Sequence, residues 1–356
     1  MKMNEVTTKM TFYQELQLNQ AGSKTLLKNC TTRKDKAKHF SIYLFKVLLT
    51  LAFCVAFVTL YSNIFGADNS IVGVVVLLCV MVFRSADLGI KCSHALGCMS
   101  VVFAILAFGP RLSNMCGAFG ALIVNLVCIF LLMILGCHNV IMFNHSTLVL
   151  GYLLLQGYDV TGELYVQRLF GILAGAAATM LIYYRNHHEK TYKRNLKDLL
   201  AEFNLHSARS RWQLTLTFGV SSILFAADLL HAPRAMWVAI AAMSVLVPFE
   251  SDLKKRVVGR IPGNIGGGLL FLLLYSILPA SMLPYMGVIG GIGVGFSAAY
   301  GWQAVFNSLG AISIAAGIFG VPGAIFLRIL NNAAGALYGL LVQKLSTTIS
   351  RKVCTQ

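Results

Sequence analysis

Long apolar stretches, separated by charged and turn residues, recur along the whole chain. A helix needs about 20 apolar residues to cross the hydrocarbon core of a bilayer. The stretches predict spans at residues 40–62, 69–83, 88–109, 113–136, 139–157 and 163–184, and then at 211–230, 234–249, 256–278, 283–299, 302–320 and 323–345. The expected fold class is therefore all-α, a polytopic membrane protein with about twelve transmembrane helices. The short second, fifth, eighth and eleventh stretches are also compatible with tilted pairs or re-entrant segments.

The two sets of six stretches carry matching sequence. LTLAF at 49–53 corresponds to LTLTF at 214–218, and the match continues in order through Phe143-Asn144 with Phe306-Asn307 and Arg168 with Arg328. An ordered series at a slowly drifting offset predicts two tandem six-helix repeats. Since each repeat holds an even number of spans, the two share one orientation and are related by an axis along the membrane normal. A weaker match, an Arg seven residues before a Gly at Arg260 and Arg328, hints at an inverted repeat of three helices within each half.

This pattern divides the chain into five parts. They are a basic cytoplasmic N-terminal tail at 1–39, a first membrane repeat at 40–185, a basic linker at 186–210, a second repeat at 211–346 and a C-terminal tail at 347–356. The first 39 residues lack the apolar core and cleavage site of a signal peptide, so we expect them to be retained.

Composition and charge placement agree with a membrane location. Of the 356 residues, 57% are apolar and 12% are charged, and the net charge of +16 collects beside the predicted spans. Lys and Arg concentrate in the tail, the linker and the turns on the same side, which predicts cytoplasmic N- and C-termini in the inner membrane. Anionic lipid headgroups at the cytoplasmic face are the expected partners of these charges. No segment between spans is long enough for a nucleic-acid surface, so nucleic acid is not an expected partner.

The sequence contains no recognisable motif for catalysis or metal binding. The nine Cys include no CxxC pair and no spacing with His that suits zinc, and most lie in apolar stretches. HExxH and paired intramembrane Asp residues are absent from the sequence. We therefore expect no cofactor, no metal and no enzymatic activity. The glycine-rich segments GNIGGG and GVIGGIGVG lack the context of phosphate loops, and we expect them to pack helices closely.

Arginines within the spans are the main candidates for chemistry. Arg260 and Arg328 lie about six residues from opposite ends of their helices, and His94 and Arg168 occupy the corresponding places in the first half. An ionisable group at this depth is costly and by default marks a functional site. An Arg can bind a carboxylate in two-point fashion, which suits an anion path. The structural alternative is that these side chains reach the headgroups or pair with helix-end carbonyls.

Amides and aromatic rings complete the predicted substrate site. Phe143 with Asn144 and Phe306 with Asn307 place a ring and an amide at matching points, suited to a planar organic anion, although hydrogen bonding between helices is an equal alternative. Asn264, Asn331 and Asn332 add polar groups beside the helices that carry the two arginines. Asp228 is the clearest carboxylate within a span. We expect it to pair with Arg234, with a proton relay as the alternative.

The segment at residues 211–275 resembles the fusaric acid resistance (FUSC) family of membrane proteins, which also includes aromatic acid exporters and is similar to plant aluminium-activated malate transporters. The resemblance is carried by Trp237 after a short turn, Pro248-Phe249 at the end of a span, a basic turn, and Arg260 followed by Gly263. It implies that Arg260 and Arg328 line an anion path. The first half departs from the pattern, with His94 in the place of Arg260 and Gly171 in the place of Asn331.

The leading functional hypothesis is an inner-membrane transporter that exports small organic anions, with aromatic carboxylates as the favoured class. Two alternatives stay open. One is a passive anion channel, and the other is a membrane scaffold or auxiliary subunit that transports nothing. A homo-oligomer is compatible with each of these hypotheses.

Overall fold

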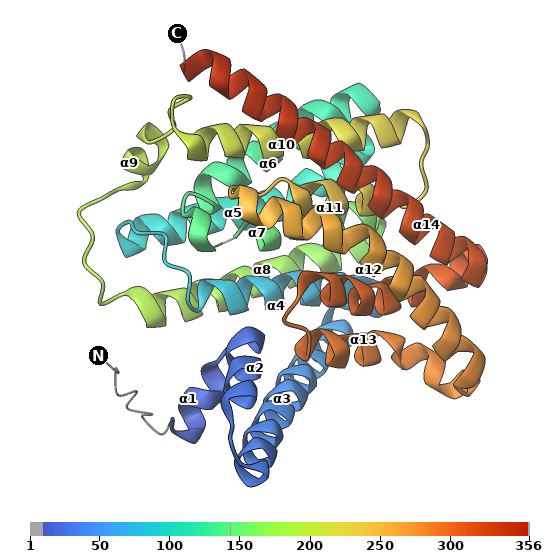
Figure 1. The fold of residues 1–356 in the computed structure, drawn as a ribbon. Coiled ribbons are helices and arrows are strands. Elements are labelled where there is room, and N and C mark those ends of the chain that lie inside the picture. The colour runs from blue at the N-terminus through green and yellow to red at the C-terminus, as the bar shows by residue number, and fades with distance from the viewer. Residues whose placement is uncertain (1–9, 143, 355–356) are drawn as a thin grey trace. The chain divides into compact units, whose positions relative to one another are not determined.

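Nearly all of the described chain is helical. The computed structural model describes residues 10–142 and 144–354. It is 84% helix, with fourteen α-helices and no strand within the described residues. The predicted all-α class is therefore confirmed, and Figure 1 shows the order of the helices.

Helices coincide with the predicted spans. Those of the first half are α3 (Arg33–Phe65), α4 (Ser70–Phe83), α5 (Cys92–Met115), α6 (Ala118–Gly136), α7 (His145–Gly157) and α8 (Gly162–His187). Those of the second half are α10 (Ala208–Leu229), α11 (Ala235–Val245), α12 (Glu250–Ile277), α13 (Met286–Gly295) and α14 (Tyr300–Cys354). Three short helices lie outside the predicted spans, namely α1 (Phe12–Gln17), α2 (Gln20–Asn29) and α9 (Leu196–Ala201).

The last two predicted spans lie in the single run of α14. This run is interrupted at Gly320, whose φ of 70° is left-handed, and Pro322 follows it. A glycine in this conformation followed by a proline is a common way to end one helix before the next begins. The interruption lies at the predicted boundary between residues 320 and 323.

Seven helices of the described chain are long and apolar enough to cross a membrane: α3, α5, α6, α8, α10, α12 and α14. Shorter apolar helices lie at Ala67–Phe83, Ala235–Val245 and Ala280–Gly295. These lengths support a multi-pass membrane protein. Twelve crossings and a tandem repeat stay predictions, because an eleven-residue helix such as α11 rises only about 16 Å.

Internal contacts divide the chain into two compact units. The smaller combines residues 1–55 with 262–324, and the larger combines 56–261 with 325–356. In the smaller unit, the Tyr43 hydroxyl donates to the Gly295 carbonyl at 2.9 Å, and the Lys46 ammonium donates to the Leu18 carbonyl at 2.9 Å. The Lys46 ammonium also donates to the Ser23 hydroxyl of α2. These bonds attach the α1–α2 segment and α13 to the first part of α3.

The core of the larger unit spans both predicted halves. Helix α10 packs on α6 as well as on its own neighbour α11, and α5 packs on α6, α7 and α8. Fully buried side chains include Met99, Leu132, Leu148 and Tyr152. The first helix of the second predicted half is therefore part of the same core as the first half.

Glycines allow close helix contacts at several points of the fold. A Cβ on Gly335 of α14 would overlap the Val238 carbonyl of α11, and a Cβ on Gly175 of α8 would overlap Val76 of α4. Within the smaller unit, a Cβ on Gly267 would lie 2.6 Å from the Val305 carbonyl. Glycine contacts of this kind let helix backbones approach in a membrane, as expected for GNIGGG.

The linker after α8 is attached to the turn between α4 and α5 through Asp87. The carboxylate accepts hydrogen bonds from the Tyr192 hydroxyl at 2.6 Å, the Lys190 ammonium at 3.1 Å and the Gly89 amide at 2.9 Å. Burial acts to raise the pKa of Asp87, but these hydrogen bonds outweigh it and lower the pKa below its ordinary value. The linker is thus held by a carboxylate in its charged form.

We predict that Gly335→Ala destabilises the protein by about 1–3 kcal/mol, because the added methyl group forces α14 away from α11. Thermal unfolding of the purified protein in detergent measures the effect. Gly317→Ala is the matched control on the same helical run, since a Cβ there meets nothing within 4 Å. Equal unfolding temperatures for the two variants would contradict the close packing of α11 and α14.

We predict that acid releases the linker. A carboxylate with a depressed pKa stabilises the docked linker above its unfolded value of 3.8, and this stability is lost as the pH falls through the lower folded value. Hydrogen exchange at residues 188–195 should accelerate below that pH. Asp87→Asn should give the fast exchange already at neutral pH, and slow exchange in that variant would show that another contact holds the linker.

Candidate functional site

Arg260 lies at the centre of a buried polar cluster in the larger unit. Its side chain on α12 is 7% exposed. Nη1 donates to the Ser244 hydroxyl of α11 at 2.7 Å, while Nε and Nη2 donate to Oδ1 of Asn332 on α14 at 3.1 and 2.8 Å. Both of these acceptors are neutral, and they orient the guanidinium.

Arg328 is connected to the same cluster through α14. The Asn332 amide that accepts from Arg260 also donates to the Arg328 carbonyl at 2.7 Å, one turn earlier. The Arg328 guanidinium lies 5.1 Å from the centroid of the Trp237 ring, which is nearly fully buried on α11. A guanidinium over an indole is a favourable cation–π arrangement. Nδ2 of Asn331 donates to the Pro233 carbonyl at 2.9 Å, just before α11.

Arg168, at the corresponding place in the first half, binds backbone rather than an open site. Its guanidinium donates to the Leu155 and Tyr158 carbonyls at 3.2 and 2.6 Å, and its Nε donates to Oδ1 of Asn69 at 3.1 Å. The last carbonyls of a helix have no partner within that helix. Arg168 therefore satisfies the C-terminal end of α7, which is the structural alternative raised for these arginines.

The other predicted residues of the first half do not join the Arg260 cluster. His94 is exposed on the first turn of α5. Asn144 is buried, and its Nδ2 donates to the Gly136 carbonyl at 2.8 Å across the turn from α6 to α7. Phe143, predicted to act with it, lies outside the described residues.

Three predicted residues belong to the smaller unit. Asn264 is buried and accepts from the Ser308 hydroxyl at 3.0 Å. Phe306 stacks on Trp302 with ring centroids 6.2 Å apart, and Asn307 is exposed. Their role in substrate binding stays a prediction.

Asn332 was expected only as a polar group beside the arginine helices, and Ser244 and Trp237 were not among the predicted binding residues, although all three contact the two arginines. Ser244 is the one hydroxyl in the apolar sequence of α11, and Asn332 follows Arg328 by one helical turn. The position of Asn332, a polar residue in an apolar helix one turn from an arginine, is therefore visible in the sequence. The sequence did not indicate that both would converge on Arg260.

The expected ion pair of Asp228 with Arg234 is wrong. Within the described residues Asp228 forms no ion pair, and the Arg234 guanidinium lies 5.5 Å from the centroid of the Tyr158 ring. Arg234 precedes α11 with a left-handed φ of 57°. This backbone conformation accompanies the placement of its guanidinium over Tyr158.

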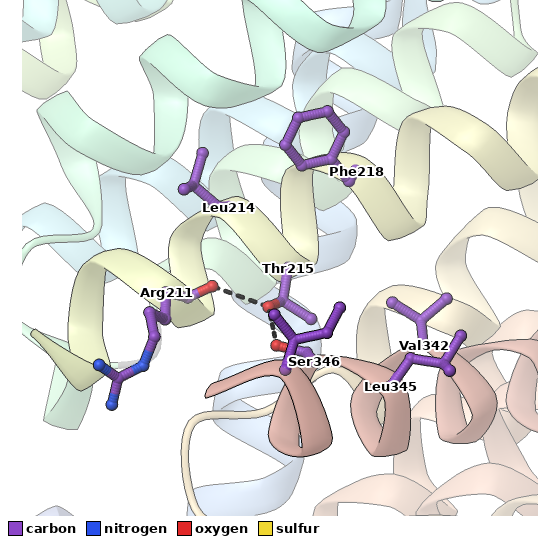
Figure 2. A pocket seen from close by; sticks show the side chains of 8 residues that line it. Arg211, Leu214, Thr215, Phe218, Val342, Leu345 and Ser346 are labelled. Carbon is purple, nitrogen blue, oxygen red and sulfur yellow. Dashed lines mark hydrogen bonds between the residues drawn. The ribbon is translucent and has the colours of Figure 1, made fainter. Parts of the chain in front are cut away.

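A separate groove of about 370 Å³ runs between α10 and α14. Figure 2 shows the Thr215 hydroxyl hydrogen bonded to the Arg211 carbonyl and to Ser346, with apolar side chains further along. Its walls are formed mainly by Leu214, Phe218, Val342, Leu345 and Ile349. None of the predicted binding residues lines this groove, whose apolar character is that of a helix surface facing lipid.

Residues 221–342 match the family model described as fusaric acid resistance protein-like. The match confirms the predicted family resemblance for this part of the chain, which includes α11, α12, Arg260 and Arg328. Members of this family are transporters and not enzymes. Together with the apolar helices, the family indicates a membrane transport protein. No curated protein and no solved structure matches the chain.

We predict that Arg168→Lys lowers stability by about 1–3 kcal/mol, because lysine cannot reach all three acceptors and leaves buried carbonyls without a donor. The unfolding temperature in detergent measures this loss. Arg185→Lys is the control, since Arg185 is exposed near the end of the same helix. An unchanged unfolding temperature for Arg168→Lys would show that the end of α7 does not depend on the guanidinium.

Proposed function

We propose that this protein exports small organic anions, with aromatic carboxylates as the favoured class, across the inner membrane. The observation that carries the proposal is the buried guanidinium of Arg260, oriented by Ser244 and Asn332 within the region that matches the family. The N- and C-termini lie in the cytoplasm, as the distribution of Lys and Arg favours.

The chemistry of the cluster supports an anionic substrate. A guanidinium keeps its charge under all physiological conditions and offers parallel donors that match a carboxylate. Trp237, which lies under Arg328, supplies an aromatic surface in the same cluster. An aromatic carboxylate presents both a charged group and a flat ring. The two arginines therefore bind the carboxylate, and the indole contributes apolar contact.

Two other functions give different results in the same experiments. A passive channel conducts the anion whenever a voltage is present, without accumulation against a gradient. A scaffold or auxiliary subunit moves no anion, and its phenotype survives neutralisation of both arginines.

We predict that Arg260→Gln and Arg328→Gln each raise the half-saturating concentration for labelled hydroxybenzoate uptake into everted vesicles. The loss of one charge-assisted hydrogen bond of about 1.5–3 kcal/mol corresponds to roughly a tenfold to hundredfold change. The double variant should abolish uptake. Uptake is compared with and without a proton gradient to distinguish the exporter from the channel.

Lys255→Gln is the matched control, because Lys255 is a cation on the same helix whose side chain is 73% exposed. It should transport like the wild type. Wild-type vesicles that take up no organic anion under any gradient would overturn the exporter proposal. A double arginine variant that retains full activity in cells would instead favour the scaffold.

A further inference from the structure

A second polar site lies at the other end of α10, apart from the arginine cluster. A pocket of about 340 Å³ is lined by Ser113 and Asn114 of α5, Cys116, Ala118 and Ala121 beside or on α6, and Ala227, Asp228, His231 and Ala232 at the end of α10. Under the predicted topology this end of α10 faces the external side. Asp228 is thereby a carboxylate near the end of a membrane span with access to solvent.

The groups that face Asp228 leave its charge without an ionic partner in the described residues. The α6 wall consists of Ala118 and Ala121, and helix α11 contains no titratable side chain. The α5 wall contributes the neutral Ser113 and Asn114, and the nearby Arg111 is paired with Asp159 at 2.6 Å. The titratable neighbours that line the pocket are therefore His231 and Cys116, while Arg234 in the same turn lies over Tyr158.

A polar stripe runs along α10 from the pocket toward the opposite end. Gln213, Thr217 and Ser221 follow at intervals of four, and Asp228 lies two turns beyond Ser221. This spacing puts all four on one face of the helix. Gln213, Thr217 and Ser221 are at most 3% exposed. Helix α10 therefore carries a buried polar line on one face, and this face continues to a carboxylate.

Two atoms at this part of the α6–α10 contact are fully buried and have no hydrogen-bond partner among the described residues. They are the Ser221 hydroxyl and Nδ2 of Asn125 on α6, and both residues are 0% exposed. Contacts of Gln213 with Met133 and of Phe225 with Phe119 show that α6 and α10 run antiparallel. This register places Asn125 at the level of Ser221. Oδ1 of Asn125 accepts from the Tyr152 hydroxyl at 2.7 Å.

Buried donors and acceptors without a partner are costly, and a bridging water satisfies them where several polar groups converge. Ser221 of α10 and the hydrogen-bonded pair of Asn125 and Tyr152 lie at one level of the fold, two turns of α10 from Asp228. A water bound at this level would link these groups. Chains of polar side chains and water of this kind carry protons through membrane proteins.

We propose that Asp228 binds the proton that drives export, and that Ser221, Asn125 and Tyr152 form the first part of its path inward. This proposal rests on the proposed export function and adds its coupling ion. The Asp228 carboxylate takes a proton from water in the external pocket and becomes neutral. It then gives the proton to water on the inner side, so that the carboxylate returns to its charged form and no other reactant is needed.

The test uses the full-length protein in proteoliposomes with labelled hydroxybenzoate. Counterflow, the exchange of labelled for unlabelled substrate, needs no net proton movement, whereas accumulation under an imposed pH gradient does. Asp228→Asn should retain counterflow and lose stimulation by the gradient, together with the substrate-dependent pH change in the lumen. Asp252→Asn is the matched control, because this carboxylate pairs with Lys255 near the start of α12, and it should behave like the wild type.

A second pair of variants tests the path. Ser221→Ala should slow gradient-driven accumulation and leave counterflow intact, whereas Ser222→Ala should change neither, since Ser222 bonds to the Phe218 carbonyl and to Tyr338 instead. Gradient-driven accumulation by Asp228→Asn at the wild-type level would overturn the proton site while leaving the export function in place. Absence of counterflow in the wild type would overturn both proposals together.

Discussion

The absence of water from the bilayer core is the constraint on which the rest of this structure depends. Lipid offers no hydrogen-bond partner, so a buried donor or acceptor depends on the protein or on a bound water, and an arginine brings five donors to be satisfied. Arg168 and Arg260 meet this constraint in different ways. Arg168 uses the carbonyls at the end of α7, whereas Arg260 uses the side chains of Ser244 and Asn332. Backbone acceptors fix a helix end, and side-chain acceptors can rearrange when a substrate enters.

The same comparison distinguishes the two predicted halves. At the repeat offsets, Leu78 corresponds to Ser244 and Ile172 corresponds to Asn332, while His94 takes the place of Arg260. Under the predicted repeat, the first half therefore has other residue types at all three places. The apolar Leu78 and Ile172 offer no side-chain acceptor to a cation there. The Arg260 cluster belongs to the second predicted half alone among the described residues.

The sequence predicted the helices well and the contacts between them poorly. The length of an apolar stretch predicts where a helix lies, and a helix is observed at each predicted span. Spacing within a helix also gives its faces, which is why Arg260 and Arg328 could be selected. Spacing does not give the partner on another helix. Asn332 and Ser244 were therefore not predicted as hydrogen-bond acceptors of Arg260. For the same reason Arg234 was predicted to pair with Asp228, whereas its guanidinium lies over the Tyr158 ring. The role of Arg168 at a helix end likewise depends on where α7 stops, which hydropathy defines only to within a few residues.

Short helices explain why the arginines lie where they do. Helices α7 and α11 have 13 and 11 residues, so they rise about 20 and 16 Å, which is less than the thickness of a hydrocarbon core of about 30 Å. A helix that stops early leaves its last carbonyls at membrane depth, where they require donors. Arg168 supplies them at the end of α7, and Arg256 donates to the Ser244 carbonyl at 3.2 Å near the end of α11. One helical turn after Arg256, Arg260 reaches the Ser244 side chain. The position of Arg260 in the proposed anion site therefore depends on the short helix beside it. The end of α11 supplies polar acceptors that stabilise a buried guanidinium.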